Sequence, residues 1–195
     1  MNRLFVFCIA ALTATTGIAD EREVDKRKNL VSLTSEVYKI DEDAPTVGEL
    51  ASTARRCMLS KLTNSEVVTR GSTQFLGAGG PKAQSVVGGG ELIQVFDEAE
   101  GLVVANQSRD YRWLALNQNV RSRMTLEARE GRFRIVHSAI ESVSRSTGST
   151  TNRGYAKVST RRGAGGKPAI RELETATELV AQCVLGTSAE TDDDW

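Results

Sequence analysis

The residues best suited to chemistry in this chain are arginines that alternate along two segments joined by a Glu130–Gly131 turn. Side chains two residues apart lie on one face of a strand, and a planar guanidinium binds carboxylate or phosphate through paired hydrogen bonds. Two interpretations stay open: a surface that binds an anionic ligand, or a solvated face that pairs with Glu127, Glu141 and the acidic C-terminal segment. The candidate anion-binding residues are Arg121, Arg123, Arg132 and Arg134.

Catalytic groups are scarce. His137 is the only histidine, and alternation places it on the apolar face with Phe133 and Ile135, which predicts a core residue. No GxSxG, HExxH or CxxC motif occurs. The stretch GAGGKP resembles a phosphate loop, but Arg161 stands where glycine is needed and Pro168 where Ser or Thr is needed. We therefore predict no catalytic residue, no cofactor and no enzymatic activity.

Composition also limits the possible sites. Hydrophobic residues make up 39% of the 195-residue chain, which excludes wholesale disorder, a collagen and a polytopic membrane protein. One histidine and three cysteines are too few for a multi-ligand zinc site. The acidic clusters Asp41–Asp43 and Asp192–Asp194 lack EF-hand spacing and read as a solvated turn and tail. We expect no metal site.

Charge is balanced overall but not along the chain. There are 25 basic and 25 acidic residues in total. Between Arg109 and Arg171, however, 14 residues are basic and 4 are acidic, whereas Glu172–Trp195 holds 7 acidic and no basic residues. The neutral total therefore conceals a basic centre and an acidic end.

The N-terminus has the parts of a secretory signal. Arg3 precedes an apolar run over residues 4–12, and small residues at Gly17 and Ala19 suit signal peptidase. The run is too short to span a bilayer, and no longer apolar segment follows. We predict cleavage after Ala19 and a secreted or periplasmic protein with no membrane-spanning segment after cleavage.

Cleavage leaves two cysteines, Cys57 and Cys183, in a compartment that favours oxidation. A disulfide between them is the simplest arrangement. Two buried free thiols, which behave as small apolar groups, are the alternative.

Patterning predicts one domain over residues 30–186, after a mobile charged arm at 20–29 and before an acidic tail at 187–195. A strand is expected over 31–40, and a helix capped by Thr46 and Glu49 follows it. A hairpin over 92–106 and a strand pair over 120–143 come next, and then a helix from Ile170 that stops at Gly186. Glycine- and serine-rich stretches at 64–90 and 144–168 are expected to be loops.

The strand pair permits a prediction of register. Pairing outward from the Glu130–Gly131 turn sets three apolar-face pairs opposite one another. These pairs are Ala128 with Phe133, Leu126 with Ile135, and Met124 with His137.

Residues 46–140 resemble the bacterial domain of unknown function 4468, a secreted family with a fold like that of the TATA-binding protein. The likeness rests on the helix TVGELASTARRCMLSKL, the hairpin IQVFDEAEGLVVAN and the strand pair VRSRMTLEAREGRFRIVHSAIE. This chain differs in its glycine-rich insertion and in carrying Cys57 and Met58 on the helix. The resemblance implies a fold but no activity, catalytic residue or cofactor.

Together these features predict an α+β domain, in which a four- or five-stranded antiparallel sheet has two helices on one face, in the order β-α-β-β-β-β-α. The predicted function is an exported, non-catalytic binding or structural module of the cell envelope. Its expected partner is an anionic envelope component or an acidic protein. Nucleic acid is not expected, because the protein is predicted to be exported and the arginine-bearing face lacks apolar wedges. The alternative is an envelope hydrolase or transferase with an unrecognised active site.

Overall fold

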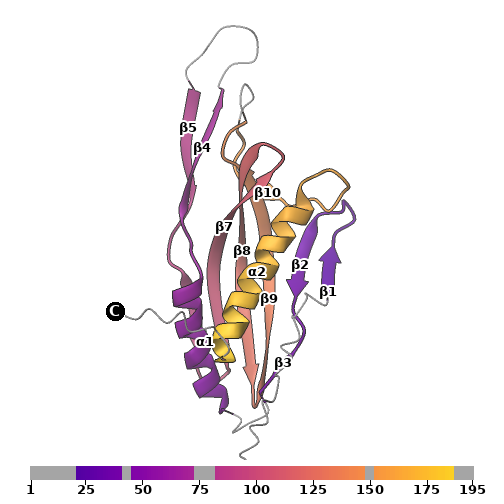
Figure 1. The fold of residues 1–195 in the computed structure, drawn as a ribbon. Helices are drawn as coiled ribbons and strands as arrows, with labels where there is room; N and C mark the ends of the chain where they lie inside the picture. The colour runs from indigo at the N-terminus through magenta and orange to yellow at the C-terminus, as the bar shows by residue number, and fades with distance from the viewer. Residues whose placement is uncertain (1–20, 41–44, 73–81, 148–151, 187–195) are drawn as a thin grey trace, which may run out of the picture.

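The computed structural model describes residues 21–40, 45–72, 82–147 and 152–186. Within them the chain forms two helices and ten strands, drawn in Figure 1. The helices are α1 (Val47–Lys61) and α2 (Gly166–Val184). The strands are β1 (Glu21–Val24), β2 (Leu30–Thr34), β3 (Tyr38–Lys39), β4 (Glu66–Ser72), β5 (Lys82–Gly88), β6 (Ile93–Asp97), β7 (Leu102–Trp113), β8 (Leu116–Arg129), β9 (Arg132–Ser144) and β10 (Ala156–Lys157).

Eight of the strands form one antiparallel sheet. The order across it is β1-β2-β9-β8-β7-β6, and both β3 and β10 also pair with β9. Strands β6 to β9 form a meander of consecutive antiparallel neighbours. The predicted pairs of Ala128 with Phe133, Leu126 with Ile135 and Met124 with His137 are confirmed.

Helix α1 begins as its capping box predicts. The Thr46 hydroxyl accepts a hydrogen bond from the Glu49 N–H, and the Glu49 carboxylate accepts one from the Thr46 N–H. Leu50, Ala54 and Met58 are among the residues on its buried stripe. The apolar spacing of the sequence therefore fixed which face of α1 packs on the sheet.

Helix α2 begins at Gly166, four residues before the predicted start at Ile170. Gly165 precedes it with φ of 75°, and a Cβ on Gly165 would lie 2.9 Å from the Trp113 ring. A Cβ on Gly166 would lie 2.2 Å from the Ser159 carbonyl oxygen, so only glycine fits there. Two of the glycines that suggested a loop are therefore the residues that allow the helix to start.

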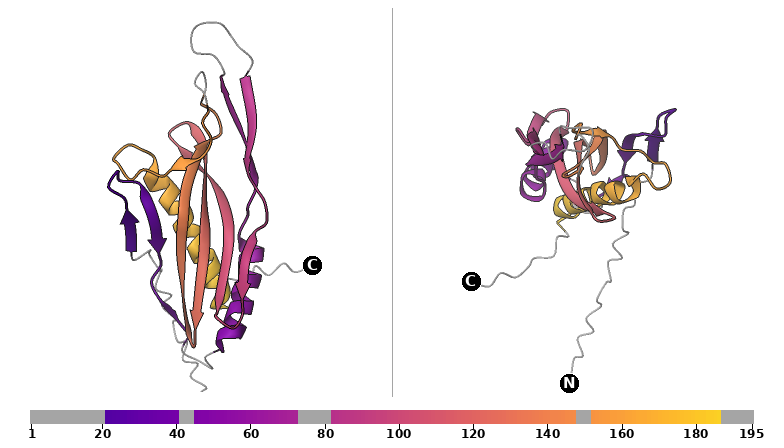
Figure 2. Two further views of the ribbon diagram at one scale, coloured as in Figure 1. Left: turned by 180° about the vertical axis from the view of Figure 1, so that it is seen from behind. Right: turned by 90° about the horizontal axis from the view of Figure 1, so that it is seen from above.

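Both helices cover the same face of the sheet. Phe133, Ile135 and Leu126 are at most 1% exposed beneath them, in one core cluster with residues of α1 and α2. Seen from behind, in the left view of Figure 2, the sheet lies in front of α2 and no helix covers that side. The sheet therefore has a buried face and an open face, as an antiparallel sheet permits.

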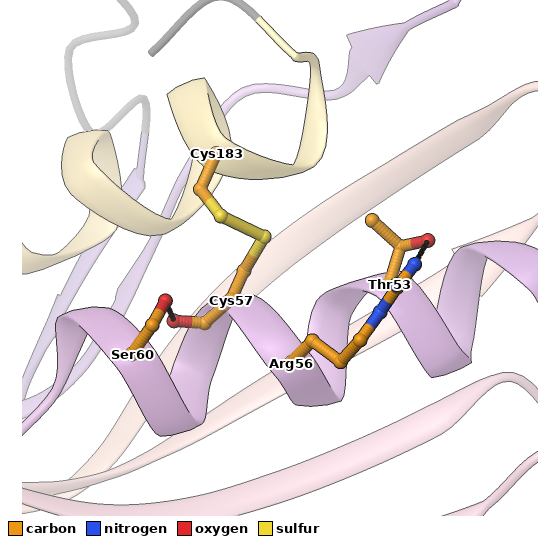
Figure 3. Close-up of a disulfide and its surroundings, with 5 residues drawn as sticks. All are labelled: Thr53, Arg56, Cys57, Ser60 and Cys183. Carbon is orange, nitrogen blue, oxygen red and sulfur yellow. Dashed lines mark hydrogen bonds between the residues drawn. A yellow bond between two sulfur atoms is a disulfide. The ribbon is translucent and has the colours of Figure 1, made fainter. Parts of the chain in front are cut away.

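A disulfide joins the two helices. Cys57 and Cys183 are bonded, with their Cα atoms 5.7 Å apart, and Figure 3 shows the bond running from α1 to α2. The predicted bridge is confirmed, and the alternative of two free thiols is wrong. The bond closes a loop with a sequence separation of 126, so its stabilisation in the chain-entropy model is about 5 kcal/mol.

The sheet is larger than the predicted four or five strands, although the α+β class holds. Residues 21–24, predicted to be part of a mobile arm, form the edge strand β1 against β2. All four side chains of β1 are exposed, so no apolar alternation revealed the strand. Charged side chains also suit an edge, because they discourage further strand pairing.

The predicted loop over 64–90 contains a hairpin instead. Strands β4 and β5 pair antiparallel and form a separate two-stranded sheet, which projects beyond the main sheet in Figure 1. Its β-branched residues Val67, Val68, Val86 and Val87 face one another across the strands. The glycine and serine residues around these two short valine pairs made the segment resemble a loop in the sequence. The predicted loop over 144–168 likewise contains the short strand β10 and the start of α2.

Replacing both Cys57 and Cys183 with alanine should lower the free energy of unfolding by about 5 kcal/mol, because the unfolded chain regains loop entropy. Urea denaturation of the oxidised protein and the variant, with and without reductant, measures the difference. Reductant should destabilise only the wild type. An unchanged urea midpoint in the variant would contradict the assignment of this bond as a principal stabiliser.

Candidate anion-binding face of the sheet

The open face of the sheet carries the predicted arginines. On β8 the side chains of Met124, Leu126 and Ala128 are buried under the helices, so the residues between them point to the other face. On β9 the buried Phe133 and Ile135 set the same alternation. We call the outward set the arginine face: Arg121, Arg123, Arg129, Arg132 and Arg134.

Two of these arginines are already paired. Arg134 lies 2.7 Å from the Glu127 carboxylate opposite it on the neighbouring strand. Arg121 lies 2.7 Å from Glu141, and its guanidinium stacks 3.9 Å above the centre of the Tyr155 ring. Both ion pairs are partly exposed, so each contributes on the order of 1 kcal/mol or less. The interpretation as a self-paired face is therefore correct for these two positions.

Arg123, Arg129 and Arg132 are exposed, and none makes an ion pair with another described residue. Arg129 and Arg132 are direct cross-strand partners, and Lys39 on β3 is the partner of Arg132 on its other side. Directly opposed side chains have Cβ atoms about 5 Å apart, and like charges there destabilise a sheet. We call Lys39, Arg132 and Arg129 the cationic row.

Cavities lie on both sides of this row. One, of about 220 Å³, is lined by Val37, Phe133 and the polar residues Glu127, Arg129, Arg132 and Arg134. The other, of about 450 Å³, is lined by Lys39, Ile40, Arg129, Glu130, Gly131 and Arg132. An anion in either cavity would meet at least two cationic side chains.

A bulge separates the two ends of the arginine face. The register of β8 and β9 shifts between Arg121 and Arg123, where Ala139 adopts a left-handed φ of 49°. The one extra β9 residue brings Glu141 opposite Arg121. Tyr155, from beyond a segment that is not described, joins them and lines a cavity of about 210 Å³. Sequence alternation alone contains no signal for this bulge or for the Tyr155 contact.

The acidic residues of α2 lie on the other side of the sheet. Glu172 pairs with Arg109 at 3.3 Å, and Glu174 pairs with Arg22 at 2.8 Å. Helix α2 covers the buried face, so these carboxylates do not reach the arginine face. The interpretation in which that face pairs with the acidic C-terminal segment is therefore wrong for the described part of the segment, which ends before Thr187.

His137 is a core residue, as predicted. It is 0% exposed, with Nδ1 2.9 Å from the Ser122 hydroxyl and Nε2 2.8 Å from the Thr177 hydroxyl of α2. The Ser122 oxygen accepts a hydrogen bond from the Gln107 amide, so Ser122 can donate its own proton to Nδ1 of a neutral imidazole. Burial lowers the pKa of His137 to about 4. The imidazole is thus held neutral between β8 and α2.

The other motifs form no constellation. GAGGKP makes the turn into α2, and the clusters Asp41–Asp43 and Asp192–Asp194 fall outside the described residues. In the described part of the chain, no three His, Cys, Asp or Glu side chains gather closely enough to hold a metal ion. Neither described helix is both long and apolar enough to cross a bilayer.

The fold is similar to that of solved structures. A DUF4468 family protein from Bacteroides ovatus ATCC 8483 superimposes with a TM-score of 0.50 and 13% identity, over 92% of this chain and 94% of that one. A TBP-like protein from Parabacteroides distasonis ATCC 8503 gives a TM-score of 0.49 and 8% identity, over 78% and 91% of the two chains. No protein-family description and no curated protein matches the sequence. The resemblance inferred from the sequence is confirmed for the fold.

The buried imidazole predicts a pH dependence of stability. In the unfolded chain His137 takes up a proton below its ordinary pKa of 6.5, whereas the folded protein resists protonation down to about 4. Stability should therefore be full above pH 7 and fall as the pH drops through this window, by about 2 kcal/mol at pH 5.

Urea denaturation at pH 7 and pH 5 measures this difference. Because the chain has one histidine, the variant His137→Leu should lose most of the slope above pH 5 even if it is less stable throughout. Equal stability of the wild type at the two pH values would show that the imidazole is not held neutral.

Proposed function

We propose that this protein is an exported, non-catalytic module of the cell envelope that binds an anionic partner through the arginine face. The observation that carries the proposal is the cationic row. Lys39, Arg132 and Arg129 occupy adjacent register positions on three neighbouring strands, with no carboxylate partner among the described residues.

Like charges held side by side raise the free energy of the unliganded fold. A multivalent anion placed against the row would relieve this repulsion and accept charge-assisted hydrogen bonds from both guanidiniums. The sheet also fixes the backbone that carries the donors, so the conformational entropy lost on binding is mainly that of the exposed side chains. The site suits extended partners that carry carboxylate or phosphate groups, such as an acidic polysaccharide or an acidic protein segment.

The side chains nearest to hydrolase chemistry support binding over catalysis. Ser122 and His137 have a hydroxyl and an imidazole within hydrogen-bond distance, but they are 4% and 0% exposed. Their hydrogen bonds to Gln107 and Thr177 tie the pair into the core. The 220 Å³ cavity brings together three guanidiniums and one carboxylate, which is a set for holding an anion.

Export is supported by two independent features of the chain. The first 19 residues have the composition of a cleavable signal. The Cys57–Cys183 disulfide is the kind of bond that persists in oxidising compartments such as the periplasm.

Reversing two charges of the row tests the proposal. The variant Arg129→Glu with Arg132→Glu should fold normally, because both side chains are exposed, and should bind polyanions on the order of tenfold more weakly or worse. Retention on phosphocellulose as a function of salt measures the change, and a pull-down from the protein's own envelope fraction identifies the partner.

The matched control is Arg27→Glu with Arg56→Glu. It changes net charge equally at two exposed positions away from the arginine face that make no described ion pair. The control should elute close to the wild type. Equal loss of retention in both variants would mean that net charge alone governs binding, and an unaltered arginine variant would exclude the row as the site.

A further inference from the structure

The turn between β7 and β8 exposes an apolar tip, formed by residues Trp113–Leu116. Leu114 is 78% exposed, the highest value among the large exposed hydrophobic side chains of the described residues, and Leu116 is 41% exposed. Trp113 is half-buried beside them. A contiguous apolar group of this kind on a protein surface marks an interaction site.

Leu114 is also unusual in its backbone. Its φ is 54°, in the left-handed region where glycine, asparagine and aspartate are the favoured residues. The position therefore carries a leucine that is favoured neither by the turn nor by packing against the protein. Leu114 combines a backbone conformation that leucine disfavours with a side chain that is exposed to water. Residues that conflict with local preferences in this way are expected at functional sites.

Basic side chains lie beside the Trp113 side of this tip. Trp113 lines a cavity of about 360 Å³ together with the loop before α2 and the first turns of that helix, which lie beside the top of β7 and β8 in Figure 1. The cavity contains no carboxylate among its lining residues. We call its four basic side chains the basic collar: Arg161, Arg162, Lys167 and Arg171. All four are exposed, and none has an ion pair within the described part of the chain.

We propose that the apolar tip and the basic collar together form a peripheral docking surface for an anionic lipid bilayer. Leu114 and Leu116 would enter the boundary between headgroups and acyl chains, and the Trp113 indole would lie at the interface that tryptophan prefers. The collar would contact lipid phosphates.

The exposed leucines beside the basic collar favour an anionic bilayer over a soluble anionic polymer. An acidic polymer would use the four cations but would leave the two leucines in water. A bilayer with anionic headgroups satisfies both, because apolar burial and electrostatic attraction add in interfacial binding. This surface includes no residue of the arginine face, so it does not depend on the function proposed above.

Co-sedimentation with vesicles tests the inference. The full mature chain should bind phosphatidylglycerol–phosphatidylcholine vesicles and bind pure phosphatidylcholine vesicles far more weakly. Leu114→Asn keeps a residue that tolerates the left-handed backbone, so it should fold normally and lower the partition coefficient by about tenfold. Arg161→Gln with Arg162→Gln should lower it by roughly 25-fold, about fivefold for each cation.

Two controls separate the tip from other surfaces. Leu59→Asn removes a leucine that is 50% exposed on α1 and should leave vesicle binding unchanged. Leu114→Asn should keep full retention on phosphocellulose, because Leu114 is not part of the arginine face, so failure of the arginine-face proposal and failure of this one give different results. In a Trp195→Phe background, the emission of Trp113, the remaining tryptophan, should shift to the blue on anionic vesicles.

Three results would overturn the inference. One is failure of the wild type to bind anionic vesicles. Another is normal binding by Leu114→Asn together with loss in the collar variant, which would show that the collar attracts the vesicle by charge alone and that the tip does not enter it. The third is vesicle binding without a shift of Trp113 emission, because the tip would then remain in water.

Discussion

The disulfide between Cys57 and Cys183 fixes α1 against α2 on a single face of the sheet, and the arrangement of the remaining side chains depends on that contact. With both helices on one side, alternate residues of β8 and β9 are buried on either side of the bulge, most of them are apolar, and the residues between them face outward. The arginines therefore share the open face. The disulfide and the core together hold the sheet as a rigid support for those charges.

Because both helices lie on one face of the sheet, the acidic side chains of α2 are separated from the arginine face. Carboxylates on α2 pair with Arg109 and Arg22 on the helix side, whereas Glu127 and Glu141 neutralise part of the arginine face. The cationic row has no such partner among the described residues. The chain has no net charge, yet its open face presents cations. The carboxylates of α2 lie on the opposite side of the sheet and cannot neutralise them. That charge separation is the electrostatic basis of the anion binding that we propose.

Sequence patterning predicted the elements whose residues alternate strictly or repeat at helical spacing. The register from Met124 to His137 and the caps of α1 are correct for this reason. It missed β1, whose side chains are all exposed, and the bulge at Ala139, which breaks the alternation. Lys39 was missed as part of the site because its pairing with Arg132 is long-range. The left-handed φ of Leu114 likewise has no signature in the sequence.

The central claim is that the unpaired arginines, rather than the whole basic segment, bind the anion. An NMR titration with inorganic polyphosphate that follows the arginine Nε–H signals tests it most directly. The account predicts large shifts for Arg129 and Arg132, and small ones for Arg22 and Arg109, which are paired on the helix side. Uniform shifts across all arginines, or no shift on the arginine face, would contradict it.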